Sequence, residues 1–404
     1  IAWRRGSTPQ MFPQGSPRSL ERGFKRAKIS AYVADFSLYG VGGGGSLEAL
    51  GVNSEESGKY AYERAVNSGA IFPNRTNTGI AGVTNFPISV MDISYFPTER
   101  GIYNFNTDLN SDGSLKNAKQ NFGAITRAIT SDTDFDNANI ETLEFWLMNP
   151  LISGDGGIVR ATGDLNIDRT NSIKRNETGG KLIFNIGDVS EDFVPDGFSN
   201  FENGIPAGKK VKEGVPNERQ NIEETIFGIA PTQQFVTNAF STVSEESRTA
   251  QDVGLDGLAN VSPLENDTYD EKRFFQPYLN RINSVVTDAK AKQAFLDDPA
   301  GDDYNGYLAE KYNKVSSLIL RYKDYMGLEN NSPTTNSSNT NSNNSLGNTQ
   351  ANTQQPDRED LNQDNTVNDT EAYYQYEIDI KTEKLKVGQN YIVDKIVREI
   401  SENP

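Results

Sequence analysis

The sequence of 404 residues contains no cysteine and no histidine. The missing thiols exclude a disulfide framework and a cysteine nucleophile, and the missing imidazoles exclude a histidine general base. Together, these absences also exclude a zinc site built from cysteine and histidine ligands. The common hydrolase mechanisms that use these side chains are therefore excluded for this chain.

Positive charge and long apolar runs are also scarce. The chain has 39 lysine and arginine residues against 56 aspartate and glutamate residues, which gives a formal net charge of −17. Because this charge repels a phosphate backbone, we expect no nucleic-acid partner. No run approaches the roughly 18 apolar residues of a membrane-spanning helix. The chain begins with Ile1 and lacks a signal-peptide pattern, so we expect a mature product or an excised segment.

Apolar residues make up only 35% of the chain, but aromatic residues make up 10%, and these bury the largest area per side chain. The length predicts two to three domains at roughly 150 residues each. Strand-like runs occur at residues 29–39, 125–130, 140–151, 181–189 and 372–380, and residues 390–400 resemble a further strand. Residues 278–286, 289–296 and 308–326 show the three- and four-residue apolar spacing of helices, including an apolar stripe from Leu308 to Tyr322 that we interpret as core.

These runs predict five units along the chain. In the run at 140–151, Ile140, Leu143, Phe145 and Leu147 would face one core while Trp146 and Met148 face the other side, as in a covered sheet. The predicted units are an extended strand-and-loop segment at 1–92, a β-sandwich at 93–205, a mainly helical segment at 206–328, a disordered Asn/Ser/Thr linker at 329–356, and a β segment at 357–404 that starts a further β domain.

A calcium loop is the only metal site that the sequence suggests. With Asp360 as its first residue, the loop places Glu371 at the twelfth position, where an EF-hand has its bidentate closing ligand. Asn365 replaces the usual glycine, and a polar linker and a strand stand where the flanking helices would be. The alternative is a cluster of Asx turns that caps the following strand. The predicted ligands are Asp360, Asn362, Asp364, Thr366, Asn368 and Glu371.

Four further patterns have structural explanations that we favour. The string from Gly40 to Gly45 matches G-x-G-x-x-G, but no helix follows that could hold a pyrophosphate, so we interpret it as a flexible loop. Glu141 and Glu144 would point to opposite faces of a strand, which does not suit paired acid/base catalysis. Aromatic side chains on a sandwich can stack on sugars, and the candidates for this role, with core packing as the favoured alternative, are Tyr103, Phe105 and Trp146. The related strings at 108–112 and 164–168 are interpreted as ordinary turns, because Lys and Arg occupy their twelfth positions.

Five segments resemble, in the same order, the gliding-motility family SprA, called Sov in some species. They are residues 101–151, 179–206, 249–258, 299–313 and 357–376, and residues 24–40 and 62–74 look like preceding blocks of the same family. This family is the outer-membrane translocon of the type 9 secretion system in Bacteroidetes. The resemblance implies that the chain is one segment of a much larger protein whose barrel lets folded cargo cross the outer membrane.

The resemblance also implies a fold class and a function. We expect a mainly β protein with α elements, in which 93–205 form a jelly-roll or galactose-binding-like sandwich outside the membrane. The expected function is that of a non-enzymatic structural segment of the translocon at the outer membrane or cell surface, supporting gliding motility. The expected partners are the rest of the barrel protein, a partner barrel, a plug protein and exported cargo. The alternative is a surface carbohydrate-binding module on the same sandwich.

Overall fold

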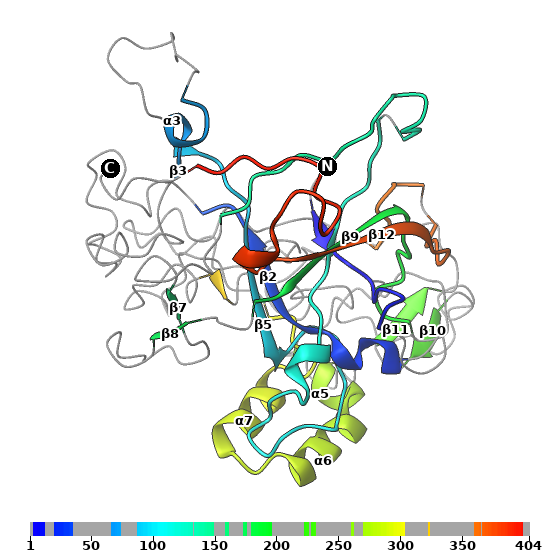
Figure 1. Ribbon diagram of the computed structural model, residues 1–404. Coiled ribbons are helices and arrows are strands. Elements are labelled where there is room, and N and C mark those ends of the chain that lie inside the picture. Colours follow the sequence, from blue (N-terminus) through cyan, green and yellow to red (C-terminus); the bar gives the residue numbers. More distant parts are fainter. Residues whose placement is uncertain are drawn as a thin grey trace, which may run out of the picture.

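The architecture combines short antiparallel strand pairs with a group of helices (Figure 1). A computed structural model describes residues 3–12, 20–34, 66–73, 87–131, 133–148, 179–195, 260–261, 270–303, 322–323, 359–364 and 366–398, together with the backbone of four further short strands. The described α-helices are α3 (Ser68–Ile71), α5 (Glu271–Phe274), α6 (Gln276–Val285) and α7 (Ala289–Asp297), and short 3-10 helices occur at Leu20–Lys25, Ala118–Gln120 and Thr382–Lys384. None of the described helices has the length and apolar character that a membrane crossing requires.

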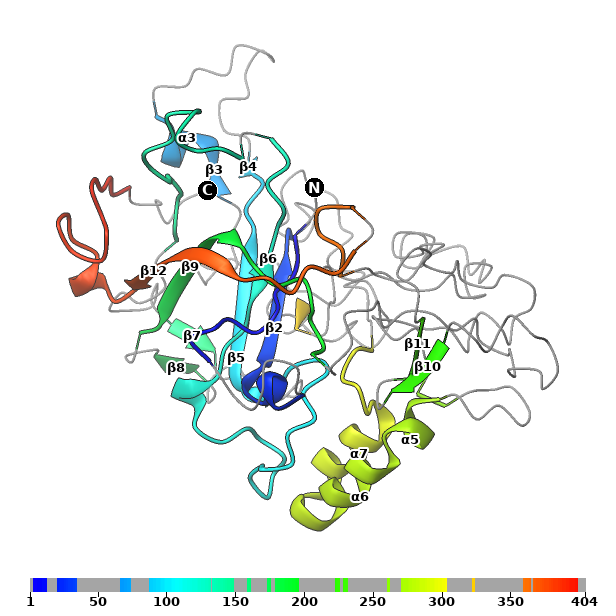
Figure 2. The same cartoon turned by 90° about the vertical axis from the view of Figure 1, so that its right-hand side faces the viewer.

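Within the described residues, every sheet consists of two antiparallel strands. The longest pairs are β2 (Ala27–Tyr32) with β5 (Asp92–Arg100), and β9 (Lys181–Asp188) with β12 (Ala372–Asp379). The strands β2 and β5 run side by side through the middle of the molecule (Figure 2). The shorter pairs are β1 (Arg4–Arg5) with β6 (Ile125–Thr126), β3 (Val66–Asn67) with β4 (Pro87–Ile88), β7 (Ile158–Arg160) with β8 (Ile173–Arg175), and β10 (Ile222–Thr225) with β11 (Gly228–Pro231). The fold class is therefore mixed, with both strands and helices.

The main core lies between the helices and residues 102–115. Leu279 and Ile282 on α6, and Val286 directly after it, are fully buried at three- and four-residue spacing. One face of this helix therefore points into the core. Aspartate side chains begin two of the helices: Asp270 accepts a hydrogen bond from the Arg273 amide before α5, and Asp288 accepts one from the Ala291 amide before α7. The helices predicted at 278–286 and 289–296 are confirmed. The segment 102–115 contributes Ile102, Tyr103, Phe105, Leu109 and Leu115 to the core.

The predicted strands at 181–189 and 372–380 are also confirmed, as β9 and β12. Their sequences lie far apart, but eight residue pairs from Lys181–Asp379 to Asp188–Ala372 form one antiparallel ladder. The run at 29–39 forms a strand that begins at Ala27 and ends at Tyr32, and the run at 125–130 contributes only the two residues of β6.

Two strand predictions are wrong. Residues 140–148 have no regular secondary structure, and their large side chains are about half exposed, with Leu143 at 60% and Trp146 at 40%. Residues 392–398 likewise form no strand, and Val393 is 72% exposed. The physical reason is that a strand needs a hydrogen-bonded neighbour, and alternation in the sequence does not supply one. The two covered faces expected for 140–151 are absent from the described residues 140–148.

The remaining organisation predicted from sequence stays a prediction. The jelly-roll or galactose-binding-like sandwich at 93–205 is not seen among the described residues, whose sheets have two strands each. The linker at 329–356 and the Gly40–Gly45 loop lie outside the described residues, as does the helical stripe from residue 308 to residue 321. Tyr322, at the end of that stripe, is buried and stacks on Tyr32 at a ring distance of 4.0 Å.

Candidate functional site

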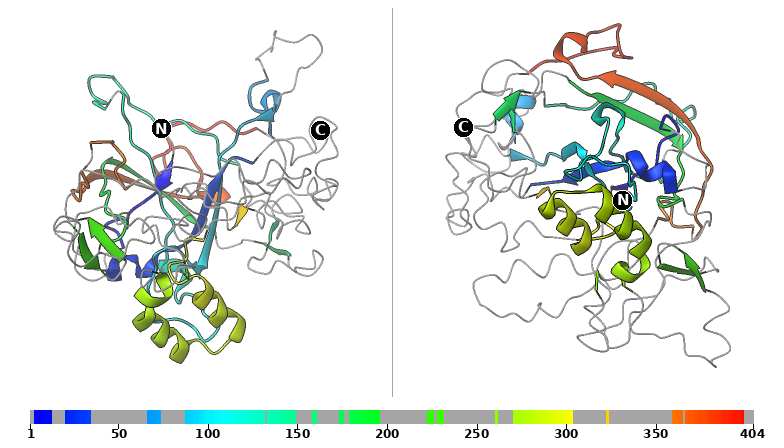
Figure 3. Two further views of the ribbon diagram at one scale, coloured as in Figure 1. Left: turned by 180° about the vertical axis from the view of Figure 1, so that it is seen from behind. Right: turned by 90° about the horizontal axis from the view of Figure 1, so that it is seen from below.

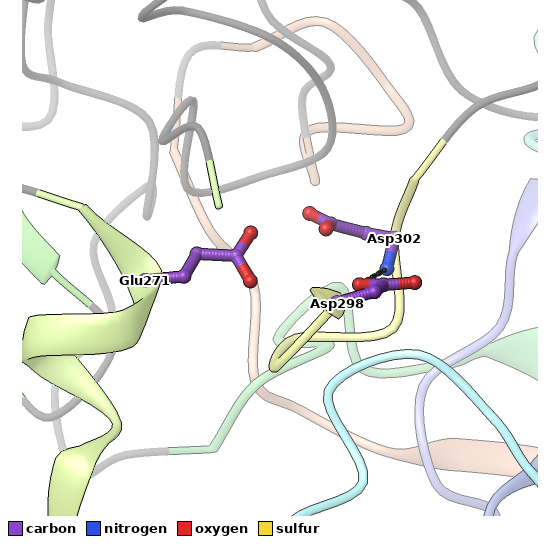
Figure 4. Close-up of side chains that lie close together, drawn as sticks. All are labelled: Glu271, Asp298 and Asp302. Atoms are coloured by element: carbon purple, nitrogen blue, oxygen red, sulfur yellow. Dashed lines mark hydrogen bonds between the residues drawn. The ribbon is translucent and has the colours of Figure 1, made fainter. Parts of the chain in front are cut away.

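Three acidic side chains meet where α5 lies beside the loop after α7. Glu271 is the first residue of α5, Asp298 follows the last residue of α7, and Asp302 lies four residues further along the chain. One carboxylate oxygen from each lies within 4.8 Å of the others, and Figure 4 shows the three groups facing one another. Glu271 and Asp302 are 0% and 1% exposed, so this acidic cluster is buried at its centre.

Hydrogen bonds from the loop and from Tyr103 account for one oxygen of each carboxylate. Glu271 Oε2 accepts from the Ala300 amide at 2.8 Å. Asp298 Oδ1 accepts from the amides of Gly301 at 2.7 Å and Asp302 at 3.1 Å. Asp302 Oδ2 accepts from the Tyr103 hydroxyl at 2.7 Å. The acidic cluster therefore ties together α5, the loop at 298–302 and the core segment that contains Tyr103.

Arg100 at the end of β5 also binds this loop. Its guanidinium donates to the carbonyl oxygens of Asp298 and Pro299, both at 2.6 Å, and lies 4.6 Å from the Phe295 ring centre. It also donates to the Tyr278 hydroxyl at 3.3 Å. Burial raises the pKa of Tyr278, and the charge of Arg100 acts in the opposite direction.

Chemically, the acidic cluster offers hard oxygen ligands within reach of one divalent cation. The same groups also accept hydrogen bonds that fasten the loop, which is a structural task. Sequence reasoning missed the acidic cluster because Glu271 lies 27 residues before Asp298 and belongs to another helix. The signals in the sequence were the Asp270 cap, which fixes the start of α5, and the acidic string at 298–303.

The loop predicted to bind calcium folds as linked Asx turns. Asp360 Oδ1 accepts from the amides of Gln363 at 2.6 Å and Asp364 at 3.1 Å. Asp364 Oδ1 in turn accepts from the amide of Thr366 at 2.8 Å and from its hydroxyl. These hydrogen bonds to Thr366 lower the pKa of Asp364 to about 2. The structure thus brings five of the six predicted ligands together, because Asn362 and Asn368 also donate to Asp364 Oδ2.

Glu191, and not the predicted closing ligand Glu371, accepts hydrogen bonds from this loop. Its Oε1 accepts from the amides of Leu361 and Asn362, and its Oε2 accepts from the amide and side chain of Asn368. Glu371 instead lies 3.8 Å from Arg22, and burial raises its pKa against the opposing effects of Gln10 and Arg22. Calcium binding by residues 360–371 stays a prediction. No spacing rule identifies Glu191, which comes from a segment about 170 residues earlier in the chain.

The other candidate residues from the sequence separate into buried and exposed groups. Tyr103 and Phe105 are 2% and 8% exposed and belong to the core, as the structural alternative predicts, so they cannot stack on an external sugar. Trp146 is 40% exposed and contacts Phe72 edge-on at 6.0 Å. Glu141 and Glu144 are exposed side chains outside any strand. The string at 108–112 forms a turn in which Asp112 accepts from the Ser114 amide, while 164–168 lie outside the described residues.

Comparison with known proteins assigns part of the chain. Residues 277–403 match the family model SprA_N, described as motility related/secretion protein. The matched region starts in α6 and includes α7, Asp298, Asp302 and β12, whereas Glu271 and β9 precede it. No curated protein matches the chain. Residues 277–403 therefore form a segment that belongs to the SprA_N family of motility-related and secretion proteins.

Proposed function

We propose that the chain is a non-enzymatic structural segment of the type 9 secretion translocon in the outer membrane. In this role it helps to shape a conduit for folded cargo proteins and supports gliding motility. The observation that carries the proposal is the match of residues 277–403 to a family of motility-related and secretion proteins. The ordered resemblance of the segments upstream supports extending the same role to the rest of the chain.

The contacts of the described residues are consistent with a scaffold. Buried polar groups hold loops in place: the acidic cluster fastens residues 298–302, and Glu191 fastens residues 360–368. Each of these sites connects segments that are distant in sequence. Such contacts stiffen a folded body, because every buried polar group restricts the geometry of its partners.

The charge of the chain supports a second part of the proposal. A formal net charge of −17 gives the surface a repulsive field for acidic proteins and keeps it from adhering to them. A conduit wall must release its cargo, and weak adhesion favours release. We place the segment in a non-membrane part of the translocon, in contact with the rest of the barrel protein, a partner barrel, a plug protein and cargo.

Replacing residues 277–403 in the full-length protein with a glycine-serine linker tests the proposal. We expect secretion of cargo and gliding to be lost while the remainder of the protein still reaches the outer membrane. Normal secretion by the replacement strain would contradict the proposal. The purified chain should also show no turnover of ester, peptide or glycoside substrates, and saturable hydrolysis of any of these would contradict the non-enzymatic role.

A further inference from the structure

The ribbon formed by β9 and β12 has one apolar face, whereas its opposite face is mainly polar but includes Ile183 and Tyr373. Residues directly opposite each other in the ladder share a face, and three such pairs are entirely apolar. On the opposite face, Gln375 donates to Asn185 at 3.1 Å and Lys181 pairs with Glu377 at 2.6 Å. The apolar pairs are Leu182–Ile378, Phe184–Tyr376 and Ile186–Tyr374.

This apolar face is only partly covered. Phe145 lies 5.2 Å from Phe184 on the β9 side, and Tyr391 lies 5.3 Å from Tyr376 on the β12 side. Both contacts involve the pair Phe184–Tyr376, and in the next pair along the ladder Tyr374 remains 76% exposed. The ribbon lies at the edge of the molecule, away from α5, α6 and α7 (Figure 3, right). A two-stranded ribbon with an exposed apolar face is a marginal structure on its own, and a further strand would stabilise it.

The backbone of the ribbon specifies what kind of partner fits. Among the described residues, β12 pairs only with β9, so the amide and carbonyl groups along the outer edge of each strand have no ladder partner. An unpaired strand edge binds an extended polypeptide by forming a new ladder. Lipid acyl chains and compact apolar ligands cannot satisfy such a row of alternating donors and acceptors.

The charges next to the ribbon select the partner further. The segment 381–398, which follows β12 and is held to it by the contact of Tyr391 with Tyr376, carries more basic than acidic side chains in an otherwise acidic protein. Lys384, Lys386 and Arg398 are exposed. A basic neighbourhood attracts an acidic strand and repels a basic one within about 10 Å at moderate salt.

From these observations we propose that the β9–β12 ribbon is a docking site for an extended polypeptide segment in which apolar residues alternate with acidic ones. The incoming strand pairs with an outer edge of the ribbon, which has no ladder partner in the part of the chain that the structure describes, and its apolar side chains continue the face that contains Tyr374 and Phe184. Its acidic side chains are favoured by the neighbouring basic segment 381–398. The ribbon has this binding chemistry whether or not the chain belongs to a secretion machinery.

Fluorescence anisotropy with a labelled synthetic peptide tests the docking site. The probe is a strand-length peptide, roughly eight residues, of alternating valine and glutamate. A first control peptide carries N-methyl groups at every second residue, which removes the amide donors of one edge. A second control replaces glutamate with lysine. The protein variants are Tyr374→Ser, on the apolar face, and Gln375→Ser, its neighbour on the polar face.

Saturable binding of the valine-glutamate peptide, with about tenfold weaker binding to Tyr374→Ser and unchanged binding to Gln375→Ser, supports the proposal. The N-methylated and lysine peptides should bind at least about tenfold more weakly than the probe. Equal binding of the N-methylated peptide would overturn it, because the attraction would then be apolar and not strand pairing. Self-association of the chain that Tyr374→Ser abolishes, or binding to anionic lipid vesicles without peptide binding, would also overturn it.

Discussion

At the scale of single residues, buried charged side chains connect segments that apolar contacts alone would not fix. Arg26, only 4% exposed, is the clearest example. Its guanidinium donates to the Phe193 carbonyl at 2.7 Å and to Thr8 Oγ1 at 3.4 Å, and lies 3.8 Å from the Phe193 ring centre. One side chain therefore joins the N-terminal segment, β2 and the segment after β9.

Replacing Arg26 by methionine should lower the free energy of unfolding by about 3 kcal/mol. Methionine keeps much of the side-chain volume but leaves the buried carbonyl of Phe193 without its charged donor. Urea denaturation followed by tryptophan fluorescence measures the change. Arg127→Met, at an exposed position, is the matched control and should shift the transition little. An equal effect of the two substitutions would contradict this role of Arg26.

Asp92, at the start of β5, gives the fold a pH dependence of definite sign. Burial raises the pKa of Asp92 from 3.8 to about 6, and a backbone hydrogen bond with Ala34 acts in the opposite direction. Between these two values the folded chain binds a proton that the unfolded chain has lost. The contribution of Asp92 to stability therefore falls as the pH rises from about 4 to about 6 and stays low above that range.

The variant Asp92→Asn removes this titration. Its stability relative to the unmodified chain should increase from pH 4 to pH 7, and urea denaturation across this range measures the difference. Asp136→Asn, at an exposed aspartate, serves as the control and should show a flat difference. A flat difference for Asp92→Asn as well would show that the Asp92 carboxyl titrates as it does in the unfolded chain.

Calcium binding at 360–371 has an equally direct test at the residue scale. If Glu371 is the closing ligand, Glu371→Gln should lower the calcium affinity markedly, because a bidentate carboxylate is lost. Calorimetric titration of the chain with calcium measures this. Glu191→Gln is the comparison: Glu191 already accepts four hydrogen bonds from the loop, so its replacement should destabilise the loop with or without calcium. If the unmodified chain and Glu371→Gln give identical titrations, Glu371 is not a calcium ligand. The loop is then only a cluster of Asx turns.

At the scale of elements, the β9–β12 ribbon depends on one close approach between its strands. Gly187 has a φ of 139°, and a Cβ there would lie 2.5 Å from the Ala372 carbonyl oxygen on the partner strand. A side chain at this position would push the strands apart or force the backbone to change. The pairing of β9 with the start of β12 therefore requires glycine at residue 187.

Gly187→Ala should weaken the ribbon by about 1–3 kcal/mol. Hydrogen exchange of the amides of β12 should accelerate, because this ladder opens more often. Gly180→Ala is a suitable control just before β9: a Cβ there would meet only the Ile380 side chain at 3.5 Å, which is ordinary contact. If both variants accelerate exchange to the same extent, the close approach at Gly187 is not what limits the pairing.

The sequence predicted those elements that have strong local patterns of apolar residues. The helices at 278–286 and 289–296 follow from apolar spacing, and the strands β9 and β12 follow from alternation. Alternation also predicted a strand at 140–151, wrongly for the described residues 140–148, because strand formation depends on a neighbour that the local sequence does not specify.

The candidate sites show the same limit for side chains. Local spacing predicted that residues 360–368 converge, and they do so through Asx turns. It did not predict Glu191 or the meeting of Glu271 with Asp298 and Asp302, because these contacts join segments brought together only by the tertiary fold. Burial of charged groups is a property of the folded chain, and no composition or spacing rule reports it.

At the scale of the whole molecule, the chain combines a small helical core, several two-stranded sheets and a strongly acidic composition. Exposed aromatic and aliphatic side chains gather on the β9–β12 ribbon and in residues 391–397. Surfaces of this kind suit contacts with other polypeptide segments. A part of a larger assembly is expected to present such surfaces, in agreement with the family to which residues 277–403 belong.

Cross-linking mass spectrometry in intact cells that carry the full-length protein tests the proposed scaffold role most directly. Lysine-reactive cross-linkers would report on Lys384 and Lys386 next to the ribbon and on Lys290 in α7. The account predicts cross-links from these lysines to other parts of the same long polypeptide and to other proteins of the secretion machinery, including cargo. Cross-links confined to the chain itself, in cells that secrete normally, would contradict it.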